Sequence, residues 1–182
     1  MAKSKSAYSE PTKLGKRDHH IIVVWVDNET GVLARVIGLF SGRGYNIESL
    51  AVAEVDKLKH LSRITIVSIG TPEVIEQIKL QLKKLLCVHK VADFNRSDPD
   101  ILFRELALFK ILSSTKNQEK VKKACKKYNL VILDKTKKSF VIQITALRRE
   151  IDKLIKVIRP WGLVSISRTG AVAMTKGPEV FK

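Results

Sequence analysis

The chain has 182 residues, of which 45% are hydrophobic, and it carries a formal net charge of +16. This length allows one domain or two small ones, and the hydrophobic fraction is sufficient for a compact core. No segment approaches the ~18 consecutive apolar residues of a membrane-spanning helix, and the N-terminal region lacks the apolar centre of a secretory signal. We therefore expect a soluble, intracellular protein.

The sequence also lacks the common motifs of catalysis and metal binding. Cys87 and Cys125 have no second Cys or His at zinc-ligand spacing, so we expect both to be buried and no metal to be bound. There is no nucleophile elbow, zinc-protease motif or phosphate-binding loop, and Gly42 and Gly44 are too close together for a dinucleotide fingerprint. We expect no catalytic residues in this chain.

The predicted elements begin after a basic tail. Residues 1–19 are rich in Lys and Ser, contain Pro and Gly, and have few apolar side chains, which predicts a mobile segment. Strand, helix, strand, strand, helix and strand then follow, because β-branched runs alternate with apolar residues at helical spacing. Thr71 and Pro72 are the expected cap and first residue of the second helix. The predicted ranges are 21–26, 32–40, 47–55, 61–69, 72–86 and 88–94.

The same order of elements recurs in the second half. After a polar linker at residues 97–101, we expect elements at residues 102–112, 119–128, 130–133, 140–145 and 151–158, with residues 163–167 and 171–174 as the last extended chain. Residues 178–182 are a short tail. The sequence thus predicts an α+β protein with two ferredoxin-like βαββαβ domains in tandem, residues 20–96 and 102–177, each with a four-stranded antiparallel sheet covered on one face by two helices.

The positive charge is concentrated in the second half of the chain. Residues 98–182 contain 19 Lys and Arg against 8 Asp and Glu. Such a surface suits nucleic acid, an anionic membrane or an acidic protein. RNA-recognition modules of this topology carry aromatic residues on their central strands, whereas residues 61–69 contain none. Nucleic-acid binding is therefore kept only as an alternative.

The entrance to the first predicted helix, residues 27–31, has the composition of a ligand-binding turn. A helix N-terminus leaves backbone N–H groups unpaired and attracts a carboxylate or phosphate. Gly31 would let a ligand approach the backbone, and Asn28 offers both a donor and an acceptor. The arrangement suits a small zwitterion, but Asn, Thr and Gly are also ordinary cap and turn residues, so composition alone leaves both interpretations open.

A family resemblance favours the ligand-binding interpretation. The segments NETGVLARVIGLF, residues 28–40, and RGYNIESL, residues 43–50, closely resemble the opening of the small, regulatory subunit of acetolactate synthase (acetohydroxyacid synthase). The likeness continues at residues 61–63 and 81–85 and, in the second half, at RELAL, residues 104–108, and RTG, residues 168–170. It covers residues 20 to 177.

The resemblance implies a non-catalytic subunit with an effector-binding, dimer-forming ACT domain at residues 20–96. Members of the family bind a large catalytic subunit that carries thiamine diphosphate, Mg²⁺ and FAD, raise its activity, and confer feedback inhibition by valine in branched-chain amino-acid biosynthesis. The valine lies between two ACT domains of a small-subunit dimer. Carried over by motif, its contacts are Asn28, Gly31, Val32 and Leu33 of one protomer with Asn46 and Ile47 of the other.

Two further points complete the sequence-based expectations. A lysine-rich chain without a transit peptide suits a plastid-encoded algal copy in the chloroplast stroma, or a protein of the bacterial cytoplasm. The alternatives to the leading hypothesis are a nucleic-acid-binding ferredoxin-like protein that uses the basic second half, and an ACT regulator of another amino-acid pathway.

Overall fold

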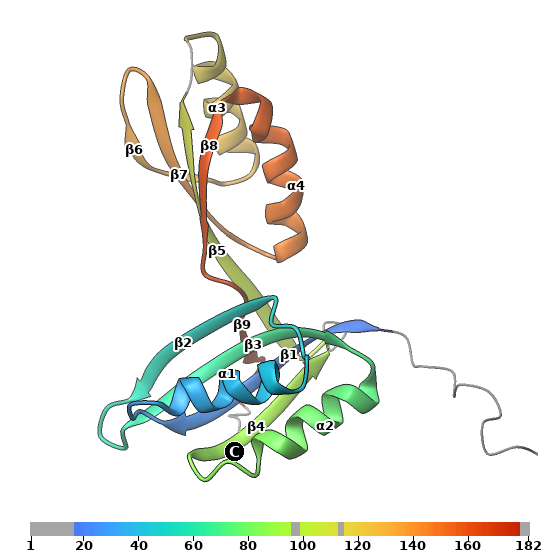
Figure 1. Cartoon of the computed structure of the whole chain (residues 1–182). Helices are drawn as coiled ribbons and strands as arrows, with labels where there is room; N and C mark the ends of the chain where they lie inside the picture. Colours follow the sequence, from blue (N-terminus) through green and yellow to red (C-terminus); the bar gives the residue numbers. More distant parts are fainter. Residues whose placement is uncertain (1–16, 96–98, 113–114, 179–182) are drawn as a thin grey trace, which may run out of the picture.

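The computed structural model describes residues 17–95, 99–112 and 115–178, and it contains two antiparallel sheets that follow one another along the chain (Figure 1). The first sheet has the strand order β2-β3-β1-β4. It is formed by β1 (Asp18–Asp27), β2 (Ser49–Asp56), β3 (Leu61–Gly70) and β4 (Val88–Asn95), with helices α1 (Val32–Gly42) and α2 (Pro72–Leu82). This is the predicted βαββαβ order.

The second sheet has the strand order β6-β7-β5-β8. Its elements are β5 (Ile101–Leu112), α3 (Thr115–Lys127), β6 (Val131–Lys135), β7 (Ser139–Ala146), α4 (Arg148–Ile158), the short 3-10 helix η1 (Arg159–Trp161) and β8 (Leu163–Arg168), followed by β9 (Val172–Thr175). Two ferredoxin-like units in tandem are confirmed. Among the described residues, no helix has the length and apolar character needed to cross a membrane.

Each domain has its own core between its helices and one face of its sheet. In the first, Ile22, Val24, Ile64 and Ile66 alternate along β1 and β3 with residues of the opposite face. The second core contains Phe109 and Phe140, both fully buried. Both cysteines are free and buried, as predicted. The period-2 alternation of the strands and the helical spacing of the apolar residues are the patterns that the cores require.

The two ends of the predicted first domain differ from the structure in detail. Strand β1 begins at Asp18, inside the predicted tail, because the long strand β3 continues the ladder to Gly70 and backbone pairing does not depend on apolar side chains. Strand β5 likewise begins at Ile101, the last residue of the predicted linker. The rest of the N-terminal tail, residues 1–16, and residues 179–182 lie outside the described residues.

Strands β5 and β9 form a two-stranded ribbon that links the domains. Residues 101–104 of β5 pair with β9, whereas residues 105–112 lie between β7 and β8. The sequence analysis assigned residues 171–174 to the final extended chain of the second domain together with residues 163–167. The structure separates the two segments, because Gly170 with φ +78° redirects the chain between β8 and β9.

The ribbon packs against the face of the first sheet that the helices leave uncovered. A third apolar cluster forms there, and Ile21, Val67 and Phe94 of the first sheet contact Ile101 and Ala173 of the ribbon. The guanidinium of Arg63 also donates a hydrogen bond to the carbonyl of Ala173 and lies 5.2 Å from the ring centre of Trp25. The central part of the first sheet is thus covered on both faces, by helices on one and by the ribbon on the other, while most of strand β2 stays exposed (Figure 1).

Gly162, between η1 and β8, has a backbone that other residues adopt with difficulty. Its φ is +97°, and a Cβ there would overlap the carbonyl oxygen of Leu112, whose N–H donates to the Gly162 carbonyl at 2.8 Å. We expect Gly162→Ala to lower the free energy of unfolding by about 2 kcal/mol or more, measured by urea denaturation. Gly42→Ala, at an open helical position without positive φ, is the control, and equal losses in both variants would contradict this reading.

Candidate functional site

The turn that enters helix α1 has an ordered backbone and an uncapped helix end. Gly31 is the N-cap with φ +85°, and no described side chain accepts a hydrogen bond from the first turn. Helix α2 differs, because the Thr71 hydroxyl accepts from the Val74 N–H at 3.5 Å, as the sequence predicted. At the α1 entrance the Val32 N–H donates to the carbonyl of Glu29 at 3.4 Å, and the next N–H groups of the first turn and the positive end of the helix dipole are open to an anionic group.

Asn28 is held beside this entrance by strand β3. Its backbone N–H donates to the carbonyl of His60 at 2.7 Å. The hydroxyl of the buried Ser62 donates to its side-chain oxygen at 3.0 Å. This bond turns the Asn28 oxygen toward the sheet and leaves the amide NH₂ to donate elsewhere. Ser62 lies in the family-like segment 61–63, but the sequence analysis gave it no role.

The other two predicted contacts follow the far end of the same helix. The carbonyl of Asn46 accepts from the hydroxyl of Ser68 at 2.8 Å, and its side chain is exposed. Ile47 is half-buried against the first core. Next along the chain, the Glu48 N–H donates to the carbonyl of Val67 at 2.8 Å. The backbone is therefore anchored to β3 while the Asn46 amide remains accessible.

The structure does not bring the two groups of predicted contacts together within one chain. The Asn28 turn follows the strand end where Asp27 pairs with Leu61, whereas Ile47 precedes Ser49, which pairs with Val67. Leu61 and Val67 are six residues apart along β3, which corresponds to roughly 20 Å at about 3.3 Å per residue. A single amino acid cannot span that distance. Within one protomer, Asn28, Gly31, Val32 and Leu33 lie together at the α1 entrance, where the side chain of Val32 is buried in the first core, and Asn46 and Ile47 lie apart from them.

Comparison with known protein families decides which fold family this is. Residues 22–90 match the family described as "AHAS small subunit-like ACT domain", and residues 104–177 match "Small subunit of acetolactate synthase". The chain belongs to the acetolactate synthase small-subunit family. The family prediction made from the helix-entrance motif is confirmed, and so is the ACT fold of the first domain.

Individual small subunits resemble the chain over nearly its whole length. It is 36% identical over 181 residues to the acetolactate synthase small subunit of Aquifex aeolicus, with 97% of this chain and 93% of the relative covered. It is 37% identical over 163 residues to the isozyme 3 small subunit of Escherichia coli, with 89% and 98% covered. The crystal structure of the Thermotoga maritima small subunit matches with a TM-score of 0.82 at 30% identity, covering 88% of this chain and 99% of that one.

In this small-subunit chain, two family-like segments of the second domain lie next to each other. The guanidinium of Arg168 donates to both carboxylate oxygens of Glu105, at 2.6 and 2.8 Å, and to Asp152 at 2.7 Å. Thr169 hydrogen-bonds the N–H of Leu106 at 3.2 Å. Glu105 is only 4% exposed, and its carboxylate is the main cause that raises the pKa of Arg168 above its ordinary value. Neither motif by itself predicts that these two segments pair.

The outer face of the first sheet is also relevant to the nucleic-acid alternative. RNA-recognition modules of this topology stack bases on aromatic residues of an open sheet face. Here Trp25 is half-buried in the cluster beneath the β5–β9 ribbon, with the Arg63 guanidinium over its ring. The ribbon occupies the central part of this face, which disfavours base stacking there.

Glu105→Gln tests the contribution of the ion pair between β5 and β8. The substitution keeps the side-chain shape but leaves Arg168 with only Asp152 as an ionic partner. Breaking a fully buried pair costs about 3–5 kcal/mol, and we expect roughly 2 kcal/mol here because Arg168 is 26% exposed and keeps one carboxylate. Urea unfolding measures the loss. Glu76→Gln, which removes an exposed pair with Lys79, should leave the urea midpoint unchanged. A native-like midpoint for Glu105→Gln would show that the Glu105–Arg168 pair does not stabilise the second domain.

Proposed function

We propose that this chain is the non-catalytic regulatory subunit of an acetolactate synthase. It binds the catalytic large subunit, raises its activity and confers feedback inhibition by valine. Thiamine diphosphate, Mg²⁺ and FAD belong to the large subunit. The family membership supports the subunit assignment. The observation that carries the effector assignment is the uncapped α1 entrance with Asn28 held beside it.

The chemistry of the α1 entrance suits the carboxylate of an amino acid. The free N–H groups of the first turn and the NH₂ of Asn28 are all donors, and Gly31 has no Cβ to block the approach. The ammonium group of the amino acid then needs an acceptor, which the exposed amide of a partner protomer's Asn46 supplies. The isopropyl group of valine rests against Leu33, which is 37% exposed, and the partner protomer's Ile47.

Pairing of two ACT domains joins the separate half-sites. Strand β2 lies at the edge of the first sheet. Antiparallel pairing of two such edges about a two-fold axis places Ser49 of one protomer beside Asp56 of its partner. Ser49 closely follows Asn46, and Asp56 pairs with Leu61 at the strand end that leads to Asn28. A homodimer through β2 thus completes two equivalent valine sites.

Inhibition then follows from binding linkage. Valine bridges the two protomers, so it stabilises the dimer arrangement in which the half-sites face each other. If the large subunit is less active when bound to this dimer arrangement, valine inhibits it. By the same linkage, a large subunit that favours a different dimer arrangement weakens the binding of valine. The regulatory signal therefore originates at the β2 interface.

Asn28→Ala tests the effector assignment. We expect this variant to bind valine at least about tenfold more weakly by calorimetric titration, because one charge-assisted hydrogen bond is lost. In a reconstituted complex it should still activate the large subunit but should respond to valine only at higher concentration. Asn117→Ala, in helix α3 of the second domain, is the control. Native-like valine binding by Asn28→Ala would contradict the site, and a failure to activate any acetolactate synthase large subunit would contradict the subunit assignment.

Mixing two inactive variants tests whether each site is shared. We expect Asn28→Ala and Asn46→Ala homodimers both to bind valine weakly. In a mixed dimer, one site lacks both amides and the other keeps both, so co-refolded protein should regain tight binding at one site per mixed dimer, which is roughly one site for every two dimers after random pairing. Calorimetric stoichiometry measures the recovery. If each site lay within a single protomer, mixing would restore nothing.

A further inference from the structure

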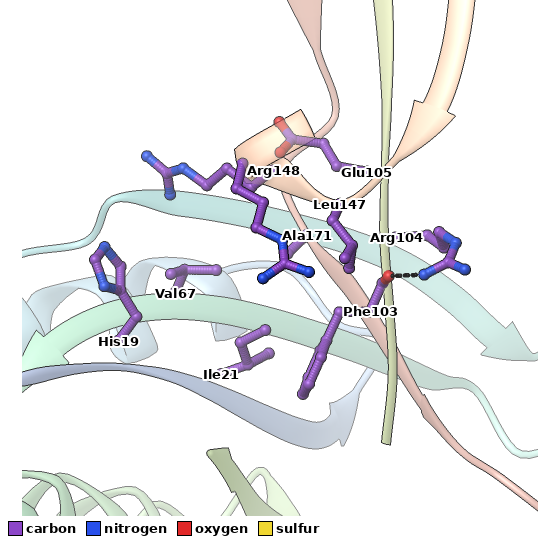
Figure 2. A pocket seen from close by; sticks show the side chains of 10 residues that line it. His19, Ile21, Val67, Phe103, Arg104, Glu105, Leu147, Arg148 and Ala171 are labelled. Atoms are coloured by element: carbon purple, nitrogen blue, oxygen red, sulfur yellow. Dashed lines mark hydrogen bonds between the residues drawn. The ribbon is translucent and has the colours of Figure 1, made fainter. Parts of the chain in front are cut away.

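A cavity lies between the two domains, away from the α1 entrance. Its volume is about 280 Å³, near the lower end of ordinary small-molecule sites. Ile21 and Val67 of the first sheet form its floor with Phe103 of β5, and Leu147 closes it from the second domain (Figure 2). These apolar side chains suit the aliphatic part of a small ligand.

The rim of this interdomain cavity is basic. Arg148 and Arg149, the first two residues of helix α4, line it, and so does His19 of β1. Arg148 donates to Glu48 at 2.9 Å, which ties the two domains together. No hydrogen bond or ion pair of Arg149 is recorded among the described residues, and its side chain is exposed. The rim thus contains a guanidinium that is available for an incoming anion.

The carboxylates around the cavity are already paired. Both oxygens of Glu105 accept from Arg168, at 2.6 and 2.8 Å. Glu48 accepts from Arg148 and lies 3.2 Å from the ring nitrogen of His19. The carbonyl of Phe103 accepts from the Arg104 guanidinium at 2.8 Å, which turns the Arg104 side chain away from the floor (Figure 2). An ammonium group entering the cavity would meet cations and few free acceptors.

From this combination we infer that the interdomain cavity binds a small aliphatic carboxylate that lacks an ammonium group, such as a branched 2-oxo acid. The aliphatic part contacts Ile21, Val67 and Phe103, and the carboxylate pairs with Arg149 and the remaining donors of Arg148. The cavity therefore has the opposite selectivity to the α1 entrance, which receives a zwitterion. Because both domains line it, the bound anion stabilises their arrangement.

The test compares two molecules that differ only at the α-carbon substituent. The probe is 3-methyl-2-oxobutanoate, which has the isopropyl group and carboxylate of valine but a ketone in place of the ammonium. Calorimetric titration of the full chain should show binding, and the thermal unfolding midpoint should rise with probe concentration. We expect Arg149→Gln to weaken binding of the oxo acid by about tenfold and Arg149→Glu to abolish it. Valine binding should be unchanged in both variants.

Two further variants separate this cavity from the α1 entrance and from general charge effects. Asn28→Ala should weaken valine binding and leave oxo-acid binding unchanged. Arg159→Gln removes an exposed guanidinium at the other end of α4 and should change neither. The inference is overturned if the oxo acid does not bind, if Arg149→Gln and Arg159→Gln bind it equally, or if valine displaces it and Asn28→Ala removes it. Unliganded unfolding midpoints show that the variants are folded.

Discussion

Strand β5 takes part in two packing arrangements at once, and the placement of the domains depends on this. Its first four residues pair with β9 beneath the first sheet, and the remaining eight form the centre of the second sheet. Twelve extended residues span roughly 40 Å. A hydrogen-bonded strand of that length is stiff, so the direction of the second sheet is set by how the ribbon lies under the first. The interdomain cavity and the Arg148–Glu48 pair exist because of this placement.

The two candidate binding sites are formed by different sets of structural elements. The α1 entrance is built from the end of β1, and β3 fixes it through the Ser62–Asn28 hydrogen bond within one domain. The interdomain cavity is built from β1, β3, β5 and the start of α4, so its shape changes if the domains move relative to each other. The proposed valine site therefore needs a second protomer, whereas the proposed oxo-acid site needs a particular arrangement of the two domains within one protomer.

The sequence predicted local structure well because local structure has a local cause. Alternation at Ile22 and Val24, the helical spacing from Val32 to Phe40, and the Thr71 cap are visible within a few residues. The motif also predicted Asn28 and Asn46 as effector contacts, and this stays a prediction. It could not reveal that Gly31 leaves α1 uncapped, since the same residues make ordinary caps. Contacts between residues far apart in the sequence could not be predicted, because no local pattern specifies them. Glu105 and Arg168 are 63 positions apart, and an apolar β9 does not specify which sheet it will cover.

The third apolar cluster determines whether the first domain could exist without the second. The first sheet keeps Ile21, Val23, Val67 and Phe94 from water because residues of the ribbon lie over them. Excision at the linker would expose a contiguous apolar sheet face, a feature that promotes aggregation in soluble proteins. Transfer of the first domain to another protein would have to carry the ribbon along, or replace the buried face with polar residues. The first domain therefore depends on residues of the second to bury one face of its sheet.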